Sequence, residues 1–326
     1  MDEFDLIDRI VSELGPATHG KAVVAGPGDD CAQVMVAPGF DLVSSIDTFV
    51  ENRHFPAHAS GDLVGYRAMV VNLSDLAAMG AQPSHALLAM TLPDIDTDWI
   101  DAFCQGVRKA CIQFSCPLVG GNITRGPLSI SVSVHGLVDK VASMMRSGAK
   151  PGELLCVTGS VGGAGLALAH PRFEEDWSLQ RLEDLPADDD CLPIRQYYMP
   201  QPRLALGQKL VGLVSAAIDV SDGLVADAGH LAKASVVSLA IQLENVPCFP
   251  GTEVERAIVT GDDYELCFTV AEELFEKVRL IALKQNIPVQ VIGRVESGNG
   301  VRLYLHGNRV TIDEKGYQHF VSKTRS

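Results

Sequence analysis

Several widely separated aspartates occupy positions where carboxylates can do metal chemistry. Each follows a short apolar run or lies in a glycine-rich turn, where its side chain would project from the edge of a sheet or helix. Carboxylates bind hard cations such as Mg²⁺, which proteins often share with phosphates. We therefore predict that these side chains converge on one metal–phosphate site. The segments are residues 26–32 with Asp30, 43–49 with Asp47, 72–75 with Asp75, and 218–223 with Asp219 and Asp222.

The same aspartates also have ordinary structural explanations. Aspartate is common in glycine-rich turns, so Asp30 alone decides nothing, and a strand often ends in a residue such as Asp47. Asp75 is more informative because its segment is apolar on almost every side, and a buried carboxylate needs a cation, an arginine or backbone donors. Further on, Ser221 would cap a helix, which leaves Asp219 unexplained. The same helix N-terminus would also suit a phosphate.

Hydrophobic periodicity predicts the elements that position these residues. Apolar residues recur at helical spacing over residues 4–14, 61–79 and 97–114. Gly80 is a natural terminator of the second helix, and Thr97 is the expected N-cap of the third. Strands are predicted at residues 32–36, 42–47, 85–92, 118–119, 128–135, 154–158 and 217–219, and further helices at 203–214 and 221–234.

This order of strands and helices predicts an α/β (α+β) protein with two domains. Residues 146–152, RSGAKPG, resemble an interdomain connection. We expect an N-terminal domain at 1–138 with a mixed sheet and helices, a linker at 139–152, and a C-terminal α/β domain at 153–326 that completes the active site. Residues 174–190 are acidic and poor in apolar residues, so we expect a solvated excursion there.

Composition disfavours several classes of partner. Of the 326 residues, 47% are hydrophobic and 21% charged, as in ordinary globular proteins. The formal net charge of −15 argues against nucleic acid and anionic membranes, which require a basic surface. The eight cysteines form no C-x-x-C pair, the first residues are acidic, and no apolar run is long enough to cross a bilayer. We therefore expect a cytoplasmic protein with free thiols.

Two glycine-rich stretches have both a functional and a plain reading. Gly120-Gly121-Asn122 would follow a short strand, where small residues let a ligand approach the backbone, although a simple turn is the alternative. Residues 159–165, GSVGGAG, resemble a phosphate loop but lack the Gly-Lys-Ser/Thr of a P-loop. Residue chemistry alone thus predicts a two-domain α/β protein with Mg²⁺ and a phosphate ligand.

Together these segments resemble the thiamine-monophosphate kinases, in the superfamily that includes aminoimidazole ribonucleotide synthetase and selenophosphate synthetase. The resemblance covers almost the whole chain in the family's order. Its motifs are GPGDDCA at 26–32, SIDT at 45–48, VNLSDLAAMG at 71–80, GGNITRGPL at 120–128, RSGAKPG at 146–152, IDVSDGL at 218–224, GDDYEL at 261–266 and KGYQHF at 315–320.

The resemblance implies ATP-dependent phosphorylation of thiamine monophosphate to thiamine diphosphate by a homodimer whose N-terminal domains pair their sheets. It implies catalysis through bound Mg²⁺ ions with no general base. Carried over by position, the implied Mg²⁺ ligands are Asp30, Ser45, Ile46, Asp47, Asp75, Asn122, Asp219 and Asp222, of which Asp30, Asp47, Asp75 and Asp219 carry the catalytic role. The implied ATP contacts are Gly121, Asn122, Arg146 and Ser221, and the implied substrate contacts are His54, Asp262 and Tyr317.

Three positions depart from the family pattern. Asn122 stands where Asp is usual, Ile46 where Thr is usual, and Asp262 where Glu is usual. Asn keeps an oxygen ligand but loses the charge, so we expect one Mg²⁺ to bind more weakly. The alternatives are an amide-activating synthetase of the same superfamily, a non-catalytic binder of nucleotide or thiamine phosphate, and a structural protein with incidental aspartates. The run of matched motifs favours the kinase.

Overall fold

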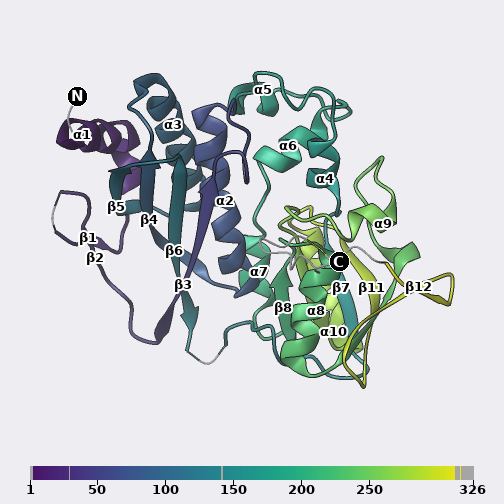
Figure 1. Ribbon diagram of the computed structural model, residues 1–326. Coiled ribbons are helices and arrows are strands. Elements are labelled where there is room, and N and C mark those ends of the chain that lie inside the picture. Colours follow the sequence, from purple (N-terminus) through teal and green to yellow (C-terminus); the bar gives the residue numbers. More distant parts are fainter. Residues whose placement is uncertain (1–2, 29, 141, 313–315, 317–326) are drawn as a thin grey trace, which may run out of the picture. The chain divides into compact units, whose positions relative to one another are not determined.

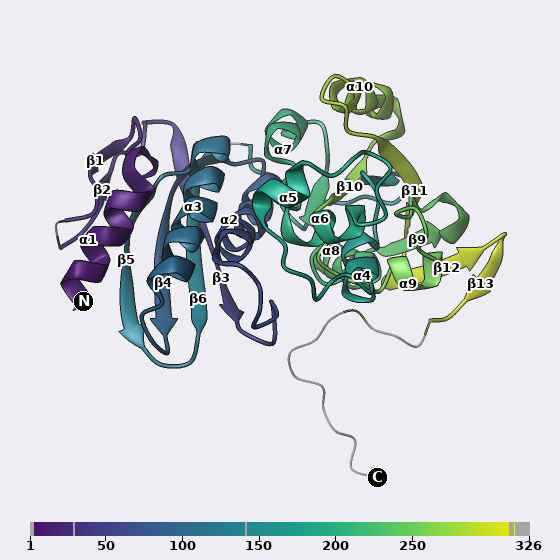
Figure 2. The ribbon, with the colours of Figure 1, turned by 90° about the horizontal axis from the view of Figure 1, so that it is seen from above.

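The chain folds into two compact units, which are described separately (Figures 1 and 2). The computed structural model describes residues 3–28, 30–140, 142–312 and 316. Unit 1 comprises Met1–Ser143 and Pro171–Gln208, and unit 2 comprises Met144–His170 and Lys209–Ser326. The predicted α/β class is confirmed. Unit 1 also includes residues 171–208, which lie beyond the boundary predicted from the sequence, and the domain limits 1–138, 139–152 and 153–326 stay a prediction.

Unit 1 is built on a mixed four-stranded sheet with strand order β3–β6–β4–β5. β6 pairs antiparallel with both β3 and β4, and β5 runs parallel to β4. The mixed N-terminal sheet expected from the sequence is therefore present. The strands are β3 (Phe40–Val50), β4 (Gln82–Leu92), β5 (Leu118–Arg125) and β6 (Ser129–Asp139), and β1 (Val23–Ala25) pairs separately with β2 (Gln33–Val34).

Helices cover one face of this sheet, and no described helix or strand lies on the other, open face (Figure 1). Along β6, Ile130, Val132 and Val134 are buried while the serines between them are not, which confirms the predicted period of two. The covering helix α2 (Gly61–Ala78) is buried along nearly its whole length, as predicted, and packs on α3 (Thr97–Phe114). α1 (Glu3–Leu14) packs on the far side of α3, followed by the short 3₁₀ turn η1 (Gly15–Thr18).

The ends of these helices show one prediction confirmed and one wrong. After α2, Gly80 adopts φ 67°, its N–H donates to the Ala77 carbonyl, and Ala81 N–H donates to the Leu76 carbonyl. This double bond to the last turn is the usual glycine terminator. At the start of α3, however, the cap is Asp96 rather than Thr97, because the Asp96 carboxylate accepts from two N–H groups of the first turn.

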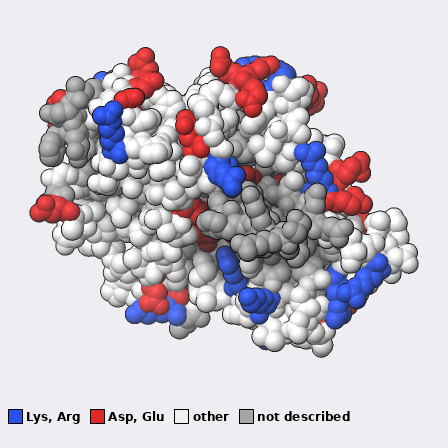
Figure 3. All heavy atoms as spheres, in the orientation of Figure 1, with Lys and Arg blue, Asp and Glu red and all other residues white. Residues whose placement is uncertain are grey.

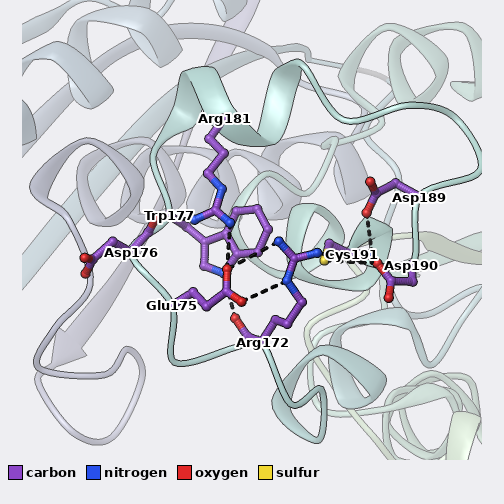
Figure 4. Close-up of polar contacts among 8 residues, drawn as sticks. All are labelled: Arg172, Glu175, Asp176, Trp177, Arg181, Asp189, Asp190 and Cys191. Carbon is purple, nitrogen blue, oxygen red and sulfur yellow. Dashed lines mark hydrogen bonds and ion pairs between the residues drawn. The ribbon is translucent and has the colours of Figure 1, made fainter.

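Residues 174–190 are not the solvated excursion that their acidic composition predicts. Trp177 is only 4% exposed, and the Arg181 guanidinium stacks 3.9 Å from the centre of its ring. Glu175 accepts from both Arg181 and Arg172, so the charges pair with one another around a buried aromatic ring (Figure 4). This stretch contains α5 (Leu179–Glu183) and is followed by α6 (Leu192–Tyr198) and α7 (Leu204–Leu210).

Unit 2 is organised around a seven-stranded sheet with order β13–β12–β9–β11–β7–β10–β8. Its pairs are antiparallel except β9 with β12. The helix α8 (Leu224–Ser235) packs on it through Leu224, Ala228 and Leu231. The strands are β7 (Leu154–Thr158), β8 (Ala216–Asp219), β9 (Ser238–Gln242), β10 (Leu266–Val270), β11 (Val289–Glu296), β12 (Gly300–Leu305) and β13 (Asn308–Val310), with α4 (Gly163–Leu168), η2 (Leu243–Asn245), α9 (Val254–Ala257) and α10 (Glu272–Leu283) between them.

Among the described residues, no helix combines the length and apolar character needed to pass through a membrane.

Candidate active site

Two of the predicted ligands meet in unit 1, where β3 lies under α2. The Ser45 hydroxyl donates to Asp75 Oδ2 at 2.5 Å, and Asp75 is half-buried between fully buried neighbours on the helix. Asp47 lies on the same face of β3 as Ser45, because strand side chains alternate. The sequence predicted that this strand ends at Asp47, but the pairing of β3 with β6 continues to Val50. Two carboxylates and a hydroxyl thus belong to one face of unit 1, a donor set that suits a hard cation.

The other predicted ligands near this strand are less directly placed. Ile46 faces away from α2 and is 64% exposed, so only its backbone carbonyl could serve a metal. Asp30 lies exposed in the bend before β2.

His54 is held in the turn that follows β3. Its Nδ1 accepts from the Val50 N–H at 3.0 Å, and its ring lies 5.7 Å from that of Phe49. Its carbonyl accepts from the Tyr197 hydroxyl at 2.7 Å, which anchors the turn to α6. Because Nδ1 is an acceptor, the neutral ring carries its proton on Nε2. The turn therefore fixes both the orientation and the tautomer of the predicted substrate residue.

The sequence suggested that Gly121 and Asn122 follow a short strand, but both residues lie inside β5. A Cβ on Gly121 would lie 1.9 Å from the Leu88 carbonyl oxygen, so this position requires glycine. Asn122 is exposed and level, across the sheet, with Ala89, Ser131 and Thr48. Three strand spacings separate β5 from β3, so Asn122 is roughly 14 Å from that strand. It is also on the face opposite Asp47, and one chain does not bring the two together.

In unit 2 the predicted residues Asp219, Ser221 and Asp222 follow one another around a tight turn. Asp219 is the last residue of β8 and is only 3% exposed. The prediction that Ser221 caps α8 is wrong, because the helix begins only after Gly223. Instead Asp227, in the first turn of α8, accepts from the N–H groups of Ser221, Asp222 and Gly223 at 2.9, 3.0 and 3.2 Å. These amides are bonded to a carboxylate, and the predicted phosphate at this helix N-terminus stays a prediction.

Asp227 was not singled out from the sequence. Burial raises its pKa to about 7, against the lowering by its backbone hydrogen bonds. The sequence feature that could have identified Asp227 is the position of an acidic residue on the apolar stripe of the helix, between Leu224 and Leu231.

Asp262 approaches the same turn from a neighbouring segment. Its N–H donates to the Ser221 carbonyl and the Tyr264 N–H donates to the Val220 carbonyl, both at 2.8 Å. Asp262 and Tyr264 adopt φ of 66° and 54°, a left-handed conformation that is uncommon outside glycine. The Tyr264 hydroxyl donates to Asp262 Oδ1 at 2.8 Å. Backbone strain of this kind persists where surrounding contacts impose it and is concentrated at functional sites.

Two buried acids of the same segment were also missed by reasoning from the sequence. Asp263 is 1% exposed, and both its carboxylate oxygens accept from the Gly162 N–H at 2.9 Å. Burial raises the pKa of Asp263 well above its usual value. Glu265 accepts from the Thr158 hydroxyl at 2.5 Å. The glycine-rich stretch 159–165 is therefore bound by a carboxylate of its own unit.

Arg146 and Tyr317 complete the predicted set. Arg146 is exposed, and its carbonyl accepts from the Ser235 hydroxyl at 3.1 Å, which attaches its backbone to unit 2. Tyr317 lies outside the described residues, so its role stays a prediction.

Comparison with known proteins gives matches along the whole chain. The AIR synthase related protein models match at residues 28–138 for the N-terminal domain and 150–306 for the C-terminal domain. Thiamine-monophosphate kinase of Escherichia coli O157:H7 is 37% identical, over 98% of this chain and 98% of its own. The Bacillus subtilis (strain 168) enzyme of the same name is 32% identical, over 98% of this chain and 100% of its own.

Solved structures of proteins with this name are also similar to this chain. Thiamine-monophosphate kinase from Stenotrophomonas maltophilia K279a has a TM-score of 0.82 and 34% identity, covering 95% of this chain and 98% of that one. AaThiL complexed with AMPPCP and TMP has a TM-score of 0.73 and 30% identity, covering 98% and 97%. The chain belongs to the thiamine-monophosphate kinase family of AIR synthase related proteins.

Proposed function

We infer that this protein phosphorylates thiamine monophosphate to thiamine diphosphate with ATP as the phosphoryl donor. The end-to-end match to thiamine-monophosphate kinases, at 32–37% identity, carries this conclusion. One relative, AaThiL, has been solved with AMPPCP and TMP, which supports ATP as co-substrate. The non-catalytic alternative is not favoured, because the carboxylates expected for the kinase are present in both units.

The acceptor chemistry explains why several acids and no evident base are needed. A phosphate monoester has a second pKa near ~6, so its attacking oxygen is already largely ionised at neutral pH. No proton has to be removed from it. The difficulty is to bring two polyanions together in line. Mg²⁺, when bound, supplies the charge that offsets this repulsion.

We propose that Asp47, Asp75 and the Ser45 hydroxyl hold Mg²⁺ in unit 1, where oxygen donors are already grouped. Asp30 and the carbonyl of Ile46 would add to this set. Asp219 and Asp222 would do the same in unit 2, beside Ser221 and Arg146 at the nucleotide. His54, Asp262 and Tyr317 would contact thiamine monophosphate.

We also propose that the protein is a homodimer that pairs the open sheet faces of two copies of unit 1. This face carries exposed Phe40, Leu42, Ile46 and Val50 on β3 and Leu87 on β4. The surface over the sheet of unit 1, at the left of Figure 3, carries few charged side chains. Apolar side chains grouped on one face are typical of a subunit interface. Asn122 lies on this face, so the proposed pairing would place it at the interface between the two copies.

A turnover assay with ATP, Mg²⁺ and thiamine monophosphate, which follows thiamine diphosphate directly, tests the proposal. We expect product that disappears with EDTA and falls at least about tenfold in Asp75→Asn. Asp41→Asn is the matched control, because it removes an exposed carboxylate from the same strand. Tight binding of both ligands without product at saturating Mg²⁺ would establish the non-catalytic alternative instead.

A further inference from the structure

We propose that Asp227 is a positioning residue for phosphoryl transfer: its buried carboxylate fixes the turn that presents Ser221 and Asp222 to nucleotide and metal. The inference rests on the proposed function, since it takes those two residues as ligand contacts. It adds a role for a side chain that need not touch either ligand.

The first support is the geometry of the carboxylate. A single oxygen, Oδ2, accepts from three consecutive N–H groups, those of Ser221, Asp222 and Gly223. Such convergence of amides creates a small anion-binding hollow at the start of a helix. Here the group that fills the hollow is a carboxyl group of the chain itself and is 3% exposed, so the three peptide planes are held in one orientation.

The second support is that the other side of the turn is also fixed. The Ser221 carbonyl accepts from the Asp262 N–H at 2.8 Å. A Cβ on Gly261 would lie 2.1 Å from that same carbonyl, so the two segments are in close backbone contact. Gly223 adopts φ 116°, which favours glycine, and completes the turn. With its N–H groups and this carbonyl engaged, the turn is left to meet ligands through the Ser221 hydroxyl and the Asp222 carboxylate.

The third support is proximity to a predicted metal ligand. Ligand atoms of Asp222, Asp227 and His230 all lie within 4.8 Å of one another. Asp227 uses Oδ2 for the backbone, so the turn that it binds carries Asp222 directly beside it. Only Asp222 need contact a bound cation, while Asp227 orients the turn.

The test must separate positioning of the turn from ordinary helix stability. Asp227→Ala removes the acceptor, and Asp227→Asn keeps an oxygen at the same place. Leu231→Ala is the matched control, because it destabilises the same helix from its buried stripe without touching the turn. Hydrogen exchange of the amides of residues 221–223 is measured in the full chain without ligands.

We expect those amides to exchange at least roughly tenfold faster in Asp227→Ala than in Leu231→Ala, with Asp227→Asn closer to wild type. Equal exchange in the Ala and control variants would overturn the proposal. This arm is independent of activity, so it stands or falls whether or not the protein proves to be a kinase.

The second arm measures the Mg²⁺ and ATP dependence of thiamine diphosphate formation. Asp227→Ala should raise the Mg²⁺ concentration for half-maximal rate by about tenfold, the size expected when a residue that orients a ligand is removed. Leu231→Ala should leave it unchanged. An unaltered Mg²⁺ requirement in Asp227→Ala would show that Asp227 caps the turn but does not position a metal ligand, which would overturn the proposal. Absence of turnover in the wild type would refute the proposed function, and hydrogen exchange would then decide whether Asp227 fixes the turn.

Discussion

Asn122 offers the most direct test of how charge at one residue controls metal binding. It is exposed on β5 and provides an amide oxygen where the resemblance to the family predicts a carboxylate. Replacing a neutral donor by an anionic one strengthens the attraction for a hard cation. We expect Asn122→Asp to lower the Mg²⁺ concentration for half-maximal rate several-fold, as read from a Mg²⁺ titration of turnover.

Thr124→Asp is the control for that titration. Thr124 is exposed on the same face of the same strand, two residues on, so the variant adds the same charge without occupying position 122. A similar shift in both variants would indicate a general electrostatic effect. No shift in Asn122→Asp would show that this residue does not limit metal binding.

Whether a functional acid can be identified from the sequence depends on the group that binds it. Asp75 could be identified because an acid in an otherwise apolar helix needs a partner, and Ser45 proved to be one. Asp227 and Asp263 could not, because their partners are backbone N–H groups of turns whose conformation depends on the folded chain. The chemistry of a side chain can be predicted from a sequence, whereas the convergence of backbone N–H groups on one oxygen cannot.

The crossing of α2 and α3 depends on glycines at the contact between the two helices. A Cβ on Gly65 would lie 2.3 Å from the Phe103 carbonyl oxygen, and one on Gly106 would lie 2.0 Å from that of Asp62. Backbone atoms cannot move aside as a flexible side chain can. We expect Gly65→Ala to lower the free energy of unfolding by about 2–3 kcal/mol in urea denaturation.

Gly229→Ala is the comparison that isolates this effect. Gly229 also lies inside a helix, α8, but a Cβ there would meet only a Val301 methyl group at 4.0 Å. With room for the methyl group, alanine should stabilise by about 0.5–1 kcal/mol through its helix preference. The two glycine-to-alanine substitutions are thus expected to change the free energy of unfolding in opposite directions. A loss of stability in both would contradict the view that close backbone contact between α2 and α3 requires glycine.

The open sheet face carries a pair of histidines that should make stability depend on pH. The rings of His85 and His135 stack with centres 4.4 Å apart, and Ser84 and Ser44 bond their Nδ1 atoms. Burial and the neighbouring His135 lower the pKa of His85 to about 4, and burial lowers the pKa of His135. Between pH ~6.5 and ~4 the unfolded chain therefore binds more protons than the folded one, so stability is full above ~6.5 and falls as the pH drops.

Replacing His85 by phenylalanine keeps an aromatic ring and removes the proton site. After discounting for partial exposure, we expect the wild type to lose about 1–2 kcal/mol more than His85→Phe between pH 7 and 4. Urea denaturation at fixed protein concentration measures both slopes. Because His135 titrates in the same direction, the slope should be reduced and not abolished. Parallel pH profiles would refute this origin.

At the scale of elements, the sequence predicted what depends on local periodicity. The helices over Gly61–Ala78 and Thr97–Phe114 and the alternating strand β6 were anticipated closely. β5 was cut short after Val119, because two glycines suggested a turn. The fold keeps them in the strand, since β4 passes so near that a Cβ on Gly121 would strike its backbone. Tertiary contact overrides propensity at such positions.

For the whole molecule, the strand order has a consequence that no motif reveals. β3 and β5 are the two edges of the unit 1 sheet, so the predicted ligands Asp47 and Asn122 are roughly 14 Å apart on opposite faces. If both serve one reaction, the site has to draw on two copies of the chain that meet at the sheet edges β3 and β5. A symmetric dimer then contains two identical sites, each made from both subunits.

Mixing of inactive subunits tests this arrangement. Asp75→Asn and Asn122→Lys are expected to be nearly inactive as separate homodimers, because each damages every site. A heterodimer purified through two different tags should recover about half of the wild-type activity, since one of its two sites takes an intact Asp75 from one subunit and an intact Asn122 from its partner. Sedimentation of Leu42→Glu, which places a charge on the open face, should show monomers, whereas Leu283→Glu on α10 should remain dimeric. A heterodimer no more active than its parents would mean that each site belongs to a single chain.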